Sequence, residues 1–319
     1  LNTRLGVTAT FISIFEPAKN YFGAEYGTPA STPHPLLDAL KSAWHGTLNY
    51  THQNSILTAR SFFQVGGVKP ARENDYGFNV GGPIAKKTSL AIEGSQKRIR
   101  GQVNGNVLVP RANERTPLAT NPALRAYVQA ILNVYPNETP NRPDIDPRML
   151  NTNSPQLIDN DSLSGRLDHR LSTKDTLTAR HAFLTQEVKA FQLIKGQNPD
   201  TTTKSHISNL TWNRTWSPNT ITSFAIGFER ARTLIVPERN NLGPQIFISA
   251  VLTPINAQNA IPINRTENKF RYSGNWRQTR GRHQFTAGFS IVRRQLNGFE
   301  GDSQLGAIQF NNNLGNDAL

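Results

Sequence analysis

The sequence predicts an all-β fold: part of an antiparallel transmembrane β-barrel, with short periplasmic turns and long extracellular loops. Apolar and polar residues alternate with a period of two in segment after segment, which is typical of strands with lipid on one side and water on the other. Short turns and long loops also follow each other in succession along the chain. A mean hydropathy of −0.50 with 36% hydrophobic residues over 319 residues is low for a compact soluble core.

No apolar run approaches the roughly 20 residues that a membrane-spanning helix requires. The longest candidates, at 11–15 and 246–252, are far too short. Strands, rather than helices, would therefore have to cross the membrane.

The alternation is clearest in the segment from Leu163 to Phe183. Its odd positions carry Leu163, Leu167, Leu177 and Phe183, whereas its even positions are mostly Ser, Thr, Arg and Asp. The residues at 172–175 form a short polar turn between the two halves. This segment predicts a hairpin with one apolar and one polar face.

The same reasoning, applied along the chain, predicts about ten strands. They lie near 46–54, 74–82, 89–100, 163–171, 177–183, 206–216, 220–232, 270–276, 283–293 and 307–312. Long connections are expected at 55–72, 101–155, 187–204 and 233–266. Within the longest connection a helix is expected at 121–134, capped by Asn121, with Pro122 in its first turn and an apolar stripe from Leu124 to Leu132.

We expect the apolar rows to form a lipid-facing belt, with aromatic residues such as Trp216 and Trp276 near the membrane interfaces. The belt comprises Leu163, Leu167, Leu177, Phe183, Leu210, Trp212, Phe224, Ile226, Phe228, Phe285, Phe289 and Ile291. A soluble β-sandwich also alternates, but it would bury these rows between two sheets. The succession of short turns and long loops favours the barrel.

The net charge of +13 does not by itself indicate nucleic-acid binding. The Lys and Arg residues are dispersed over many strands and loops, and no stacking motif accompanies them. Loops that face a phosphate-rich lipid leaflet, or a lumen that attracts anionic solutes, would need the same charge. We therefore expect outer-membrane lipid and lipopolysaccharide as partners, and no nucleic acid.

The sequence contains no convincing catalytic or metal site, so we expect no enzyme activity, cofactor or metal. Ser303 lacks the Gly-x-Ser-x-Gly elbow of hydrolases. The seven histidines show no metal-ligand spacing, and there is no cysteine. Phe62 and Phe63 are candidates for ligand contact in an outer loop, although aromatic residues can also hold a long loop against the barrel rim.

Six stretches resemble the Oar-like group of TonB-dependent outer-membrane receptors. Among them are NDYGFNVGGPI at 74–84, KKTSLAIEGSQKR at 86–98, WSPNTITSFAIGFER at 216–230 and TRGRHQFTAGF at 279–289, and the others lie at 45–63 and 163–183. No one motif is diagnostic, but their order and spacing match the group over most of residues 45–293.

The resemblance implies a barrel of about 22 strands that needs a plug, so this chain would be a fragment. Residues 1–43 would be the end of the plug domain and a linker, and residues 44–319 the N-terminal part of the barrel. The three prolines between Thr28 and Ala43 depart from the group's pattern for the final plug strand.

The implied function is import of a bulky nutrient, driven by the inner-membrane TonB energy-transducing complex, which would act on a region upstream of Leu1. A passive porin or adhesin barrel, and a soluble β-sandwich that binds glycans, are the alternatives. The solute stays open among siderophores, glycans, peptides and cobalamin-like molecules.

Overall fold

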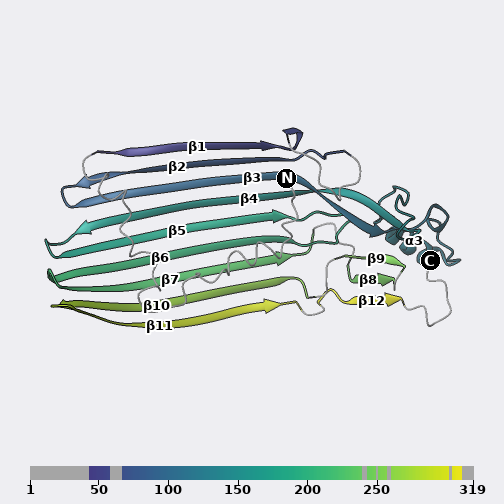
Figure 1. The fold of residues 1–319 in the computed structure, drawn as a ribbon. Coiled ribbons are helices and arrows are strands. Elements are labelled where there is room, and N and C mark those ends of the chain that lie inside the picture. Colours follow the sequence, from purple (N-terminus) through teal and green to yellow (C-terminus); the bar gives the residue numbers. More distant parts are fainter. Residues whose placement is uncertain are drawn as a thin grey trace.

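Nine long strands lie side by side in one sheet, and a helix and three short strands lie beyond one end of it (Figure 1). The structure, a computed structural model, describes residues 43–57, 67–238, 243–248, 251–256, 260–301 and 304–310. The expected plug segment and linker at 1–43 lie outside this part of the chain, except for residue 43.

Each long strand pairs with the long strand that follows it in the chain, so the order of the sheet is β1-β2-β3-β4-β5-β6-β7-β10-β11, and every adjacent pair is antiparallel. Its strands are β1 (His45–Asn54), β2 (Arg72–Ala85), β3 (Thr88–Leu108), β4 (Met149–Arg170), β5 (Asp175–Lys189), β6 (Asp200–Ser217), β7 (Thr220–Val236), β10 (Ile263–Arg280) and β11 (His283–Glu300). The all-β, antiparallel prediction is confirmed.

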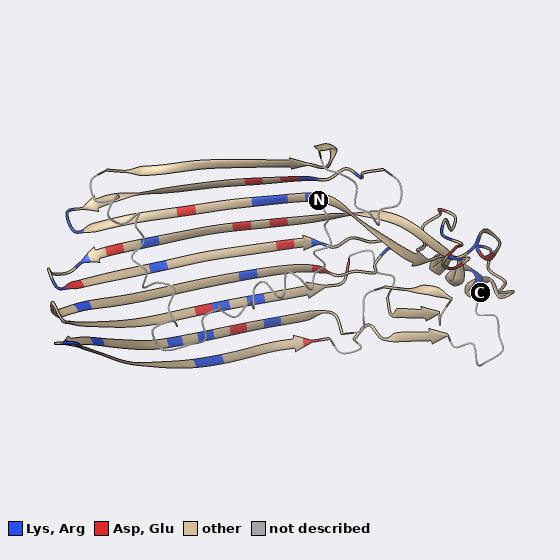
Figure 2. Ribbon diagram, in the orientation of Figure 1, with Lys and Arg blue, Asp and Glu red and all other residues tan. Residues whose placement is uncertain are grey.

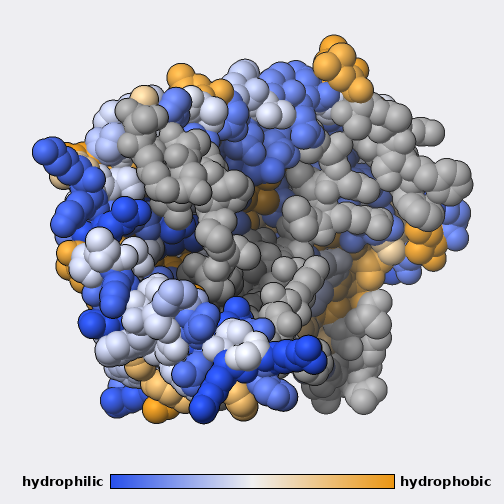
Figure 3. Space-filling model, turned by 60° about the vertical axis from the view of Figure 1, so that its left-hand side comes forward, coloured by the Kyte–Doolittle hydropathy of each residue, from blue (hydrophilic) through white to orange (hydrophobic). Residues whose placement is uncertain are grey.

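One end of the sheet, which we call the turn end, carries the connections 86–87, 171–174, 218–219 and 281–282. At the last of these, Gly281 has a φ of +60°, in the left-handed region where a side chain would strain a two-residue turn. Charged side chains are frequent at these turns, and Figure 3, which brings this end forward, shows a largely hydrophilic surface there. The opposite end, the loop end, carries the long connections.

The sheet is open, with β1 and β11 as its two edges. The expected tenth strand, β12 (Ala307–Phe310), does not continue it. β12 instead pairs in parallel with β8 (Gln245–Ile248), which also pairs with β9 (Leu252–Ile255) in a separate three-stranded sheet. The prediction that 307–312 adds a strand to the barrel wall is therefore wrong, because its partner is a loop strand.

Strands β3 and β4 are also longer than their alternation predicts, since they pair as far as Leu108 and Met149. Much of this extension, expected to be loop, is rich in asparagine. Its amides bond across the two strands: Asn104 Nδ2 donates to Asn151 Oδ1 at 2.9 Å, and Asn151 Nδ2 donates to Asn106 Oδ1 at 2.6 Å. This ladder supports pairing on one face of the extension, while Val107 and Leu150 are buried opposite each other on the other face.

The largest cluster of buried apolar residues lies at the loop end, where the ends of β3 and β4 contribute Val107 and Leu150. Many apolar side chains on the sheet stay exposed: Leu163 is 52%, Ile226 53% and Ile291 60% accessible. Ile99, Ile158 and Val188 form a small buried cluster on β3, β4 and β5. In the described part of the chain, none of the helices has the length and apolar character needed to cross a membrane.

Candidate functional site: the belt face, the polar face and the outer cap

The register places all the expected belt residues on one face of the sheet, which we call the belt face. Residues directly opposite each other in an antiparallel pair point to the same side. Leu163 is opposite Phe183, Leu177 opposite Trp212, and Leu210 opposite Ile226, which is itself opposite Tyr272. The remaining members follow in the same rows, so the whole belt lies on one face.

Aromatic rings fill the belt face around glycine. Gly274 on β10 lies between Phe224 of β7 and Phe289 of β11, whose ring centroids are 6.4 Å apart. A Cβ at Gly274 would lie 2.5 Å from the Phe289 ring and 2.9 Å from the Phe224 ring. The two rings therefore cover the glycine, and the apolar surface continues over three strands.

All four tryptophans of the chain lie on this face, toward the turn end. Trp212 Nε1 donates to Asp175 Oδ1 at 3.1 Å, and Trp216 Nε1 donates to Thr222 Oγ1 at 3.0 Å. The Arg214 guanidinium lies 4.1 Å from the Trp216 ring centroid. Indole rings with satisfied N–H groups beside charged residues are typical of a membrane–water interface.

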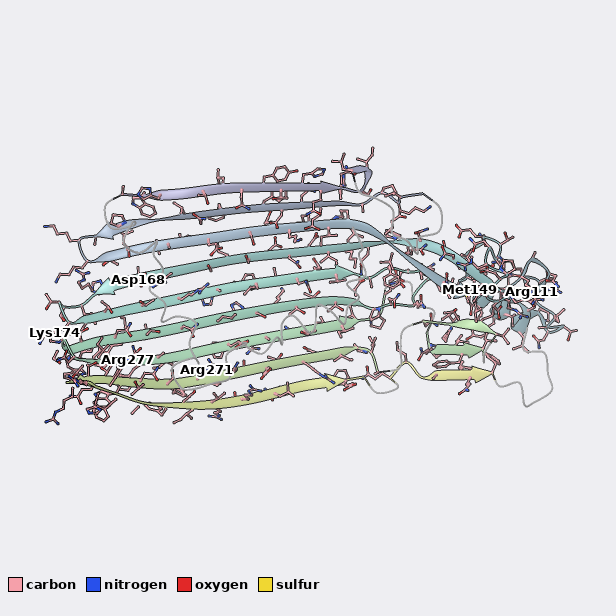
Figure 4. All side chains as sticks on the ribbon, in the orientation of Figure 1. Arg111, Met149, Asp168, Lys174, Arg271 and Arg277 are labelled. Carbon is pink, nitrogen blue, oxygen red and sulfur yellow. The ribbon has the colours of Figure 1, made fainter. Side chains whose placement is uncertain are left out.

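The opposite face, which we call the polar face, carries ion pairs and hydroxyl groups. Arg166 forms a two-point contact with Asp168 at 2.9 and 3.1 Å, and Thr178 Oγ1 donates to the same carboxylate at 2.6 Å. Lys269 pairs with Glu229 at 3.3 Å. Figure 4 shows Asp168 and Lys174 toward the turn end of the sheet, away from Arg111 and Met149 at the loop end. A face of this composition suits contact with water.

The loop end carries a folded unit, the outer cap, made of α3 (Pro122–Leu132), β8, β9, β12 and the adjoining loops. Its core comprises Val107, Val109, Ile131, Val134, Tyr135, Leu150, Leu193, Ile194, Ile246, Ile248, Leu252 and Ile255. Residues from three long connections thus pack into one cluster. The sequence signal for it was the apolar run at 246–252, whose partners are too distant in the chain to identify by periodicity.

The helix of the cap is as expected in position and capping, because Asn121 Oδ1 accepts from the backbone N–H of Ala123 at 2.9 Å. Its predicted apolar stripe is only partly buried. Ile131 and Leu132 join the cap core, whereas Leu124 and Tyr127 are 58% and 48% accessible. Only the last turn of the helix therefore contributes buried residues to the cap core.

Two contacts join β9 to the loop after α3 and to the end of β3. The buried Tyr135 hydroxyl donates to the Thr253 carbonyl at 2.8 Å, and burial raises the pKa of this phenol. The Thr253 hydroxyl in turn accepts from the Leu108 backbone N–H at 2.7 Å. The β9 segment is thereby joined to both the loop after α3 and the sheet.

A charged clamp closes the long connection between β3 and β4. Arg148 donates to both carboxylate oxygens of Glu114, at 2.5 and 3.1 Å, and the Arg111 backbone N–H donates to the same carboxylate at 2.9 Å. Partial burial opposes ionisation, but these hydrogen bonds and the neighbouring positive charges outweigh it and lower the pKa of Glu114.

Phe62 and Phe63, the candidate ligand contacts, lie outside the described residues. Among the residues that the structure does describe, no group of three His, Cys, Asp or Glu side chains could hold a metal ion.

A family model for an outer membrane beta barrel domain matches residues 42–318 of the chain. None of the curated proteins matches it.

Proposed function

The chain belongs to the family of outer membrane β-barrel domains, which places it in the outer membrane, and we propose that it is part of a receptor for TonB-dependent import of a bulky nutrient. In this proposal the belt face contacts hydrocarbon and the polar face lines the lumen. The outer cap stands on the extracellular side and contributes to solute capture.

The observation that carries the proposal is the length of the strands together with the cap. A spanning strand needs about 9–11 residues, whereas β4 has 22. At about 3.3 Å per residue, 22 residues extend about 70 Å, or about 55 Å along the membrane normal at a tilt of about 40°. This is about twice the height of the apolar band, so the wall continues well beyond the membrane.

A wall that projects this far and ends in a folded cap favours a binding role. Loops supported by a rigid scaffold commonly carry binding surfaces. A passive pore needs only strands that span the bilayer and loops that leave the lumen open. The resemblance to Oar-like receptors adds the energy source, since receptors of that group are pulled open by the TonB complex.

The proposal is tested with the full reading frame that contains this chain, purified and inserted into a planar bilayer. We expect no steady conductance, because a plugged lumen is closed, and binding of the purified periplasmic domain of TonB in interferometry. A continuously open pore that does not bind TonB would contradict the proposal and identify a passive barrel. A high steady conductance would therefore distinguish a passive pore from a plugged receptor.

A further inference from the structure

We propose that four cations on the belt face form a binding site for the phosphate groups of the outer leaflet's glycolipid. The site, which we call the basic patch, comprises Lys204 on β6, Arg230 and Arg232 on β7, and Arg293 on β11. All four side chains are exposed. Figure 2 shows Lys and Arg bands on each of these strands. The inference rests on the membrane orientation proposed above, but not on TonB-dependent transport.

The basic patch begins where the belt ends. The register puts Lys204 opposite Arg232, and Arg293 opposite Phe270, which is opposite Phe228. Each of these residues therefore points to the belt face. Arg230 is the next residue on this face after Phe228, and Arg293 is the next after Ile291, so on β7 and β11 an arginine directly follows the belt residues.

The height of the patch matches the headgroups of the outer leaflet. Arg230 lies ten residues from Thr220, the first residue of β7 at the turn end. Ten residues at about 3.3 Å cover about 33 Å along the strand, or about 25 Å along the membrane normal at a tilt of about 40°. The apolar band of an outer-membrane barrel is about 25 Å tall. Arg230 thus lies at its outer edge.

The four cations have no carboxylate within ion-pair distance among the described residues. Arg230 donates to the Asn268 amide at 3.3 Å, and Arg232 donates to the Asn264 amide at 3.4 Å. Lys204 and Arg232 are directly opposite each other, an arrangement of like charges that destabilises a sheet. An anion between them would remove this repulsion.

On β3 and β4 the arginines of the belt face are paired with carboxylates. There Arg98 pairs with Asp161 at 2.5 Å, and Arg100 pairs with Asp159 at 2.5 Å. The belt-face arginines of β3 and β4 are thus neutralised within the protein, whereas those of β7 and β11 are left for an external partner. The contrast indicates a local anion site rather than a general excess of charge.

Phosphate fits this site better than other anions available at that depth. Guanidinium groups bind phosphate through two parallel hydrogen bonds. Arg230 and Arg232 are two residues apart on one strand, so both can reach the same headgroup, and Lys204 faces them from the next strand. The occupant is attached to lipid because the patch adjoins the hydrocarbon-facing belt.

The test uses the purified chain in non-ionic detergent, with bisphosphorylated lipid A as the probe and its dephosphorylated form as the comparison. Binding is measured by thermophoresis for the parent chain and for Arg230→Gln/Arg232→Gln. The matched control is Arg180→Gln/Arg294→Gln, which removes two cations from the polar face. Each Lys or Arg near an anionic surface contributes about 1 kcal/mol, so we expect about 30-fold weaker binding in the first variant.

The control is expected to bind within about twofold of the parent, and dephosphorylated lipid A to bind the parent poorly. Millimolar inorganic phosphate should not displace the lipid. The inference is overturned if the two double variants lose affinity equally, if the patch variant binds as the parent does, or if removal of the phosphates has no effect. Should the double variant not fold, Arg293→Gln alone is expected to weaken binding about fivefold. Loss of TonB binding with retained lipid A binding would reject the transport proposal only.

Discussion

A positive charge introduced at the centre of the belt tests whether this apolar row faces the membrane or is buried between two sheets. Ile226 lies six residues from Thr220, which corresponds to about 20 Å along β7 and about 15 Å along the membrane normal. This position is close to the middle of an apolar band about 25 Å tall, where Lys or Arg on the lipid face costs about 2–4 kcal/mol. We therefore expect Ile226→Lys to lower the free energy of unfolding by that amount.

The matched control is Asn209→Lys on β6. Asn209 is opposite Gly227 and points to the polar face, where it is exposed, so the same charge is expected to cost less than about 1 kcal/mol there. Both variants are compared with the parent by guanidinium unfolding from lipid vesicles, followed by tryptophan fluorescence. Equal destabilisation at both positions, or a larger loss at Asn209, would refute the assignment of the two faces.

Three further outcomes follow from the cap and the belt. Ile194 is fully buried in the cap core, so the substitution Ile194→Ala is expected to lower the local stability of the cap by about 2–5 kcal/mol. The expected readout is faster proteolysis of the cap while the sheet stays protected. Gly274→Val is expected to displace the two phenylalanine rings that cover it and to cost about 1–3 kcal/mol in vesicle unfolding; an unchanged midpoint would contradict the close packing. The pKa of Glu114 is lowered in the folded cap, so its contribution is complete above its usual value of 4.5 and is lost as the pH falls through the lowered one. The hydrogen-exchange protection factors around Arg148 should therefore fall as the pH drops below 4.5 in the parent, but depend little on pH in Glu114→Gln.

The parts of the fold that the sequence predicts well are the strands whose residues alternate strictly. In the hairpin from Leu163 to Phe183, the two faces differ in polarity, so alternate residues differ in kind and the strand pattern follows directly. The helix at 121–134 was likewise predictable, because Asn121 and Pro122 are local start signals.

Beyond the membrane this constraint ends. Strands β3 and β4 run on to Leu108 and Met149 with amide and glycine residues that show no clear alternation, so they were expected to be loop. The pairing of β12 with β8, and the joining of Ile194 with Ile246 in the cap, depend on contacts between distant segments. No local period encodes such contacts.

Accessibility along β7 distinguishes a belt that faces lipid from one that is buried in protein, and the absence of cysteine allows single nitroxide labels to be introduced without background. Labels at each position from 222 to 229 in lipid vesicles should show oxygen access at the even positions and access to a water-soluble nickel reagent at the odd ones. A label at Ile226 that is shielded from both reagents, as between two packed sheets, would contradict the account, and so would a profile without a period of two.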